Sequence, residues 1–308
     1  MTAGTVVAVG VLVLLWASAF PIIKIGLEDL SAPHLTLLRH LVASAAFVVF
    51  LIALRRRPWP AWRDWPALFG LGTMGIFVYH LALNTGELRV SAGATSLIIA
   101  TAPLLTAIVA TALRSDRLTA LGWAGSLLGF GGVALIVIGD AAANGGAALG
   151  PVLDPYAGLI LLAALATALF AVLQRPLLER YRPIELMAYV TWGGTVPMLL
   201  FLPGLAEAVV GAWPRSALAA LHLGVFPSAI AYTLFAVALS RAPATLVTTY
   251  LYLIPIVALL LSWWWLGEVP TALTVVGGAV VVVALVVVRH AKRRDAARAL
   301  AAPRPVGD

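Results

Sequence analysis

The sequence predicts an all-α membrane protein of ten transmembrane helices, arranged as two inverted repeats of five helices around a central cavity. Three observations support this fold class. Hydrophobic residues make up 62% of the 308 residues and charged residues only 11%, so most of the chain is suited to lipid. The second half of the chain repeats the apolar pattern of the first. The basic residues gather in alternate loops.

Composition also narrows the possible functions. The absence of cysteine excludes disulfides, thiolate metal sites and cysteine nucleophiles. The formal net charge of +7 comes from inter-helix loops, where orientation in the membrane accounts for it without a nucleic-acid partner. The first apolar run lacks a basic flank before it, so we expect a transmembrane helix there and not a cleavable signal. We expect no metal ion and no cofactor.

Apolar runs of about 20 residues, the length that crosses a bilayer, recur along the chain. They predict helices at residues 5–25, 34–54, 66–86, 92–113, 119–139, 155–175, 184–202, 217–240, 244–265 and 270–289. Prolines that suit a first helical turn mark several starts: Pro33, Pro66, Pro155, Pro183 and Pro270. Three other prolines, Pro103, Pro227 and Pro255, lie inside predicted helices and should bend them.

An internal repeat organises these helices. Leu223–Gly277 repeats Leu71–Gly125 without a gap, at an offset of 152 (223 minus 71). Each copy holds an apolar run closed by an arginine, a second run interrupted by proline, and a third run that begins Thr-Ala-Leu. Because five helices is an odd number, the second repeat enters the membrane in the opposite direction. We assign residues 1–140 and 155–290 to the repeats, 141–154 to an outer linker and 291–308 to a basic, disordered tail.

The distribution of basic residues predicts the orientation. Lys and Arg follow the second, fourth and sixth predicted helices and fill the tail, whereas the loops of the other side hold only Arg89 and Arg215. The positive-inside rule therefore places both termini in the cytoplasm. Lys24, near the outer end of the first helix, either binds an anion or snorkels to the headgroups; Arg39, within the second helix, could also snorkel.

Several short motifs recur in the two halves. Ala92-Gly93-Ala94, Pro103 and Asp116-Arg117-Leu118-Thr119 are echoed by Ala244-Thr245, Pro255 and Glu268-Val269-Pro270-Thr271, and the first helix carries Trp16-Ala17-Ser18-Ala19-Phe20-Pro21. Across residues 5–290 this pattern resembles the ten-helix EamA-type branch of the drug/metabolite transporter superfamily. The resemblance implies a bacterial inner-membrane exporter, most like those of aromatic amino acids. It implies a cavity formed mainly by the first, third, fourth, sixth, eighth and ninth helices, with the fifth and tenth at the periphery. Val269 departs from the basic residue that many relatives carry there.

Polar and aromatic residues that share a helix face are the candidates for lining the cavity, since facing lipid would be costly. On the ninth helix Thr248 and Tyr252 recur at helical spacing, whereas Tyr250 points away. The candidate substrate-binding residues are Trp16, Phe20, Tyr79, His80, Asn84, Ser96, Thr101, Phe170, Gln174, Tyr232, Thr248 and Tyr252. Pro103 and Pro255 are candidate hinges. The aromatic residues can equally serve packing, and the threonines can bond their own backbone.

Aromatic walls interspersed with hydroxyl, amide and imidazole groups suit an amphiphilic small molecule, and the rings attract a cation such as an α-ammonium group. We therefore expect a monomeric exporter of aromatic amino acids (tryptophan, phenylalanine, tyrosine) and related metabolites, working by alternating access. The first alternative is a carrier of sugar phosphates or nucleotide sugars, for which only Lys24 and Arg39 supply cations. An intramembrane enzyme is the alternative from another class, but H-E-x-x-H, G-x-S-x-G and paired intramembrane aspartates are absent from the sequence.

The energy source follows from the acidic residues. No Asp or Glu lies in the middle of a predicted helix, so proton-driven antiport has no evident carboxylate carrier. His80 is the mid-membrane side chain whose type titrates near neutral pH. We expect facilitated diffusion or exchange, with coupling through His80 as the second hypothesis.

Overall fold

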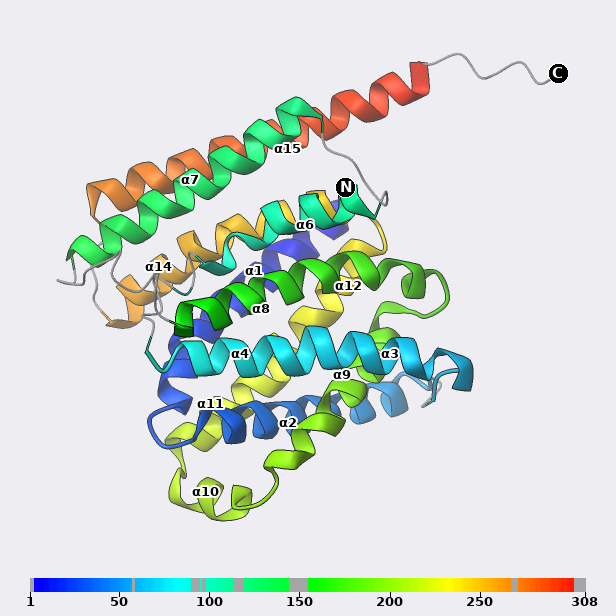
Figure 1. The fold of residues 1–308 in the computed structure, drawn as a ribbon, viewed down its shortest axis with the longest axis vertical. Coiled ribbons are helices and arrows are strands. Elements are labelled where there is room, and N and C mark those ends of the chain that lie inside the picture. Colours follow the sequence, from blue (N-terminus) through cyan, green and yellow to red (C-terminus); the bar gives the residue numbers. More distant parts are fainter. Residues whose placement is uncertain are drawn as a thin grey trace.

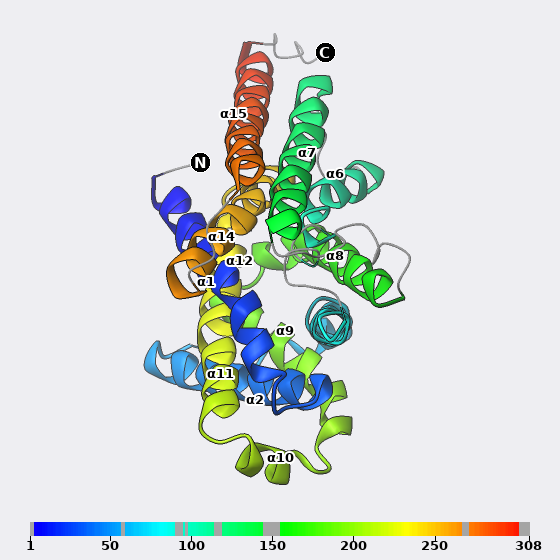
Figure 2. The same cartoon turned by 90° about the vertical axis from the view of Figure 1, so that its left-hand side faces the viewer.

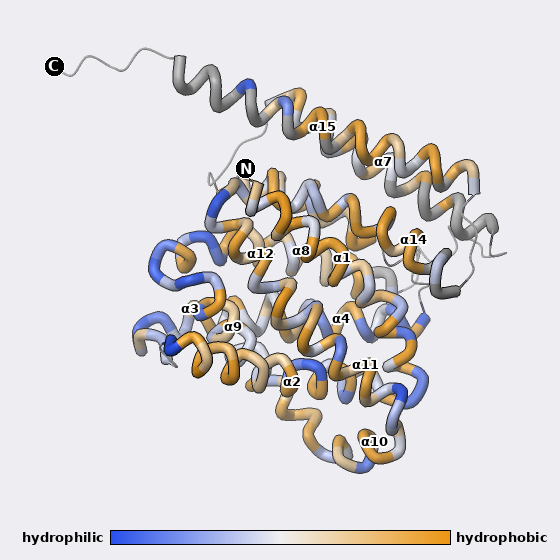
Figure 3. Tube along the Cα trace, turned by 180° about the vertical axis from the view of Figure 1, so that it is seen from behind, coloured by the Kyte–Doolittle hydropathy of each residue, from blue (hydrophilic) through white to orange (hydrophobic). Residues whose placement is uncertain are grey.

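The computed structural model describes residues 3–56, 59–89, 95, 98–113, 119–143, 155–266 and 271–301. Every regular element in these residues is helical, and most of the helices run nearly side by side across the view in Figure 1. Hydrophobic residues follow the lengths of the helices, whereas hydrophilic residues gather at the loops and helix ends (Figure 3). The predicted all-α membrane fold is confirmed.

The first half contains α1 (Ala3–Gly26), α2 (Ala32–Ala53), a 3-10 turn at Trp62–Asp64, α3 (Trp65–Gly72), η2 (Thr73–Val78), α4 (Tyr79–Gly86), α6 (Ala102–Ala112) and α7 (Ala120–Ala143). The second half contains α8 (Pro155–Leu173), η4 (Arg175–Glu179), α9 (Pro183–Met198), η5 (Leu199–Phe201), α10 (Leu205–Gly211), α11 (Arg215–Leu223), η6 (Gly224–Ala231), α12 (Tyr232–Leu239), α13 (Ala244–Thr249), η7 (Tyr250–Tyr252), α14 (Leu253–Leu266) and α15 (Ala272–Ala301).

Six helical stretches within the described residues are long and apolar enough to cross a bilayer. They are Ala3–Gly26, Ala32–Ala53, Trp62–Gly86, Gly158–Glu179, Pro183–Phe201 and Arg215–Leu239. The segments expected for the fourth, ninth and tenth helices contribute the shorter apolar helices Ala102–Ala112, Ala244–Ala258 and Val275–Val288. Two of them, Ala102–Ala112 and Ala244–Ala258, belong to predicted membrane segments in which the helix is interrupted near a proline.

The interruptions lie at matching places in the two halves. α6 begins at Ala102, so Pro103 lies in its first turn, after a turn at Ala100 and Thr101. α14 begins at Leu253, so Pro255 lies in its first turn, directly after the 3-10 turn η7. Since proline has no N–H to donate, the first turn of a new helical segment accommodates it. Both candidate hinges are therefore points where the helix starts again.

A second irregularity also repeats. The third and eighth membrane helices each contain a π-helical segment in mid-course, η2 before Tyr79 and η6 before Tyr232. π-Segments leave some backbone carbonyls outside the regular helical ladder and occur frequently at functional sites. Pro227 lies inside η6, as expected for a proline that disturbs its helix.

α7 and α15 pack against each other and extend away from the other helices (Figure 2). A Cβ atom on Gly125 or Gly132 of α7 would lie 2.7 and 2.8 Å from the side chains of Val288 and Val281 of α15, respectively. These small residues therefore permit the close approach of the two helices. α15 continues to Ala301, into the segment for which disorder was expected, and the alanines and arginines that follow its apolar part are strong helix formers.

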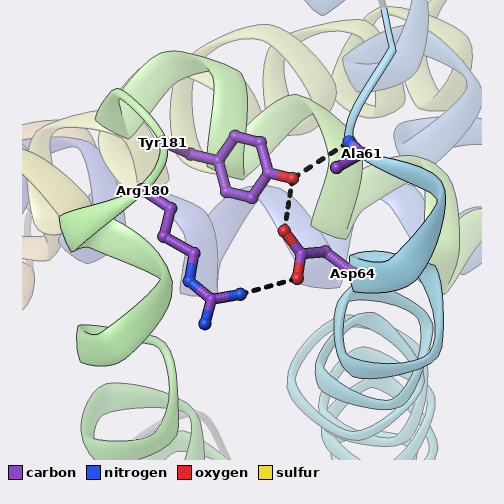
Figure 4. Close-up of polar contacts among 4 residues, drawn as sticks. All are labelled: Ala61, Asp64, Arg180 and Tyr181. Carbon is purple, nitrogen blue, oxygen red and sulfur yellow. Dashed lines mark hydrogen bonds and ion pairs between the residues drawn. The ribbon is translucent and has the colours of Figure 1, made fainter.

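Two polar clusters join elements of different halves at opposite ends of the helices (Figure 1). In the Asp64 cluster, Arg180 pairs with Asp64 at 2.8 Å, and the Tyr181 hydroxyl donates to Asp64 Oδ2 at 2.6 Å and accepts from Ala61 N–H (Figure 4). In the Arg215 cluster, Arg215 pairs with Glu28 at 2.8 Å and Ser216 donates to Asp29 Oδ2 at 2.6 Å. Each cluster joins the loop after the first membrane helix of one half to the start of the third membrane helix of the other half.

The cavity between the two halves

A cavity of about 50 Å³ lies among helices of both halves. Its lining residues are Trp16, Ala19, Phe20, Ile23, Arg39, Gly75, Tyr79, His80, Leu83, Ile99, Ala100, Ala102, Thr167, Phe170, Pro227, Tyr232, Phe235, Leu251, Ile254 and Pro255. They come from α1, α2, η2, α4, the start of α6, α8, η6, α12, η7 and α14. The second membrane helix, α2, therefore contributes to the lining in addition to the six helices that the resemblance implies. A space of this size holds a few water molecules. A ligand the size of an amino acid would require the walls to move apart.

Six Trp, Phe and Tyr residues contribute rings to the lining, and Tyr232 lies at the centre of the ring contacts. The ring centroid of Trp16 lies 5.2 Å from that of Tyr232 and 5.1 Å from that of Phe235. Phe170 meets Tyr232 edge-on at 5.8 Å. The Phe170 ring occupies the place where a Cβ atom on Gly75 would lie, so the glycine in η2 makes room for it. These rings provide flat apolar contact from both halves of the chain.

The indole N–H of Trp16 has a hydrogen-bond partner within the cavity wall: it donates to the backbone carbonyl of Pro227 at 3.1 Å. Pro227 belongs to η6, where the π-helical backbone leaves carbonyl groups free of the regular ladder. The bond therefore fixes the orientation of the ring across the boundary between the halves.

Two histidines meet beside the aromatic wall. The rings of His40 and His80 are 4.3 Å apart and nearly perpendicular. The Nδ1 atoms of His40 and His80 lie 2.8 Å from the backbone carbonyls of Thr36 and Ile76. Because a carbonyl can only accept, each Nδ1 carries a proton, and in the neutral form of each ring Nε2 is then an acceptor. His80 lines the cavity and can accept a hydrogen bond there. His40 was not a candidate from the sequence.

Arg39 contributes a positive charge to the lining. Its side chain is 2% exposed, and Nε and Nη2 donate to the Ser228 hydroxyl at 3.2 and 3.0 Å. Nη1 is buried without a hydrogen-bond partner in the described part of the chain. From its place in the sequence Arg39 could have snorkelled to the headgroups, but its side chain turns inward, because Ser228 of η6 packs against α2.

Glu87 is the buried acid that sequence reasoning missed. It follows α4 directly, is 0% exposed, and neither carboxylate oxygen has a hydrogen-bond partner among the described residues. Lys24 donates to the backbone carbonyl of Glu87, and both Lys24 and Arg39 interact electrostatically with the carboxylate. Its position one residue beyond an apolar run resembled that of a loop acid, so hydropathy alone gave no signal.

The structure brings six of the predicted site residues together in the lining: Trp16, Phe20, Tyr79, His80, Phe170 and Tyr232. Pro255 joins them, and Pro103 lies next to the lining residue Ala102. Asn84 is buried nearby and donates to Thr36 Oγ1 at 2.8 Å. Thr101 donates to the carbonyl of Ile98, so its hydroxyl is used by its own backbone.

The remaining predicted residues lie elsewhere. Thr248 donates to the carbonyl of Ala244. Gln174 is fully buried outside the lining, and its amide has no partner in the described residues. Tyr252 faces α7 and not the cavity: its hydroxyl donates to Ser126 O at 2.9 Å and its ring lies where a Gly129 Cβ would be. Ser96 lies outside the described residues.

Comparison with known proteins agrees with this duplicated architecture. The sequence profile of the EamA-like transporter family matches twice, at residues 4–138 and 155–289. The chain belongs to the EamA-like transporter family. Each half of the chain is thus one EamA unit, and the family indicates a multi-pass membrane transporter and not an enzyme.

Relatives of this EamA-like transporter include bacterial transporters. "Uncharacterized transporter YdfC" of Bacillus subtilis is 38% identical over 84% of this chain and 82% of its own length. "Probable terminal-alkyne amino-acid exporter" of Streptantibioticus cattleyicolor is 34% identical over 85% of each chain. "Uncharacterized inner membrane transporter YedA" of Escherichia coli K12 is 26% identical over 83% of this chain and 81% of its own length. One solved structure shares the fold, with a TM-score of 0.77 at 20% identity over 96% of this chain and 99% of the other.

Proposed function

We propose that this EamA-like transporter exports amino acids with aromatic side chains, as a monomer in the bacterial inner membrane with both termini in the cytoplasm. The observation that carries the proposal is the aromatic lining of the cavity between the two halves. A cavity at the interface of inverted repeats is where alternating-access carriers bind their substrates.

The chemistry of the lining supports this substrate class. The rings of Trp16, Phe170 and Tyr232 offer apolar faces that attract an indole or phenyl side chain and, by cation–π attraction, an α-ammonium group. The Nε2 atom of His80 can accept from an indole or ammonium N–H. The relative named as an amino-acid exporter adds support for amino acids as a class.

An anionic metabolite such as a sugar phosphate fits the lining less well. Binding a phosphate group requires several converging cations, and among the described lining residues Arg39 alone carries a fixed positive charge. Lys24 lies outside the lining and donates to the carbonyl of Glu87. One guanidinium suits the single carboxylate of an amino acid better.

The test is exchange of labelled tryptophan in proteoliposomes, with unlabelled phenylalanine, alanine and glucose 6-phosphate as competitors. We expect saturable exchange that phenylalanine inhibits most strongly. Phe170→Leu should weaken it by about tenfold, because it removes a ring from the lining. Phe47→Leu, an equally buried ring outside the lining, is the control and should have little effect. Exchange of the phosphate ester without exchange of tryptophan would overturn the proposal.

A further inference from the structure

We propose that Arg39 anchors the α-carboxylate of the transported molecule through its Nη1 group. This inference rests on the proposed function in taking an amino acid as substrate, but it concerns the head group and not the aromatic side chain. It therefore predicts which atoms every substrate must share. Arg39 lines the cavity beside the aromatic wall and is 2% exposed.

The guanidinium is held rigidly on one edge. Nε and Nη2 both donate to the hydroxyl of Ser228, which lies in η6 next to the carbonyl that orients Trp16. α2 and η6 approach each other closely at Gly224, where an added Cβ atom would lie 2.5 Å from the carbonyl oxygen of Arg39. The lack of a side chain on Gly224 permits this approach. An arginine held by one edge keeps its geometry fixed, so less entropy is lost when a ligand binds the other edge.

The other edge has donors without acceptors. Nη1 is buried and has no hydrogen-bond partner in the described residues. Unmatched donors at a buried cation are costly, so such groups in folded proteins are normally paired. An acceptor that arrives with the substrate would complete the hydrogen bonding of the guanidinium.

The guanidinium also lacks a hydrogen-bonded counterion among the described residues. Neither of the ion pairs found among the described residues involves Arg39, and its partner Ser228 is neutral. Glu87 interacts with Arg39 electrostatically, but its carboxylate oxygens receive no hydrogen bond and so it does not complete the guanidinium. A substrate carboxylate supplies the missing acceptor and brings a negative charge into direct contact with the guanidinium, in a charge-assisted bond stronger than a neutral one.

This assignment predicts a selectivity that the aromatic walls alone cannot produce. Tryptamine, which keeps the indole and the amine but lacks the carboxylate, should compete poorly with tryptophan. Indole-3-propionate, which keeps the carboxylate but lacks the amine, should compete better than tryptamine. If the rings alone selected the substrate, the order of these two competitors would follow the cation–π attraction and be reversed.

The experiment measures binding of labelled tryptophan and labelled leucine to the purified full-length protein, with the competitors tryptophan, tryptamine, leucine and leucinamide. In Arg39→Gln, tryptophan and leucine should each bind about tenfold or more weakly, whereas tryptamine should change little. Ser228→Ala keeps the charge of Arg39 but removes the hydroxyl that holds one edge of its guanidinium. It should weaken the binding of tryptophan and leucine less than Arg39→Gln does. Arg241→Gln, an exposed arginine in the turn after α12, is the matched control and should bind as wild type does.

The outcomes separate the two proposals. If the wild type binds leucine and rejects leucinamide but ignores tryptophan, the anchor is supported and the aromatic assignment fails. If Arg39→Gln folds and loses tryptophan and tryptamine equally, Arg39 is only structural and the inference is overturned. If Arg39→Gln fails to fold, Ser228→Ala provides the test. A Ser228→Ala variant that discriminates against tryptamine or leucinamide as strongly as the wild type does would overturn the proposed anchor. Binding of neither labelled amino acid would overturn both proposals.

Discussion

At the scale of single residues, Glu87 presents the sharpest question about energy coupling. A carboxylate buried without hydrogen bonds is costly, and binding a proton removes much of that cost. The charged and titratable groups that act on it are Lys24, Arg39 and Tyr79. Burial favours the neutral acid, whereas the positive charges of Lys24 and Arg39 favour the ionised carboxylate, so a small change in the surroundings can load or release a proton.

We expect Glu87→Gln to keep exchange of labelled tryptophan at equal pH but to lose any response of tryptophan accumulation to an imposed pH gradient, because glutamine cannot carry the proton. Glu207→Gln, which alters an exposed carboxylate in α10, is the control. Accumulation is measured in proteoliposomes with an inward or an outward pH gradient. If the wild type itself ignores the gradient, Glu87 has no coupling role, and the exchange mechanism expected from the sequence stands.

The residue scale also marks the limit of sequence reasoning. Aromatic residues such as Trp16 and Tyr232 could be predicted to line the cavity because they share a face with other polar or aromatic side chains. Tyr252 satisfied the same periodicity, yet α7 covers its face, where Gly129 leaves room for the ring. Helical periodicity identifies a face but not the neighbour that covers it. Arg39 and Glu87 required the three-dimensional packing for the same reason.

At the scale of elements, the course of the helices was largely predictable because it follows from local chemistry. Apolar length predicted the membrane helices, and Pro103 and Pro255 predicted the interruptions before α6 and α14. The π-segment η2 contains no proline, so nothing local distinguishes it from a regular helix. It accompanies the close packing of Gly75 against Phe170, which is a contact between halves.

The Asp64 cluster permits an element-scale test of stability against pH. Burial, and then the hydrogen bond to Asp64, raise the pKa of Tyr181 above the ordinary value of about 10. The folded state therefore favours the neutral phenol. Its contribution to stability is complete below the pKa of the unfolded tyrosine and is lost as the pH rises through the higher folded-state pKa.

Tyr181→Phe should therefore destabilise the protein by about 0.5–1.5 kcal/mol at neutral pH, the usual net worth of a hydrogen bond. The difference in Tm between wild type and variant should stay constant from neutral pH up to about 10 and shrink at more alkaline pH. Thermal unfolding in detergent at a series of pH values measures it. Tyr156→Phe, which leaves the cluster intact, controls for general alkaline effects. A difference that grows with pH would contradict the assignment.

At the scale of the whole molecule, the two clusters join equivalent elements at opposite ends of the bundle. The cavity, about 50 Å³, is too small for the proposed amino-acid substrate, so transport of such a molecule requires one end to open. Arg180 is 67% exposed and Arg215 65% exposed in their ion pairs. Exposed pairs contribute about 0–1 kcal/mol each, so they can break and re-form during transport. Alternating access requires that one end opens while the other stays closed.

The absence of cysteine makes this opening measurable, because one introduced cysteine reports without background. Thr167→Cys places a thiol in the cavity lining. Adding Asp64→Asn weakens the contacts of Asp64 with Arg180 and Tyr181. It should increase labelling several-fold by a membrane-impermeant maleimide that is applied on the side of the Asp64 cluster, and not by one applied on the other side. Adding Arg215→Gln should increase it from the Arg215 end alone, so each variant is the control for the other. Because breaking one cluster leaves the second intact, equal labelling from both ends in either variant would show that the clusters do not govern access.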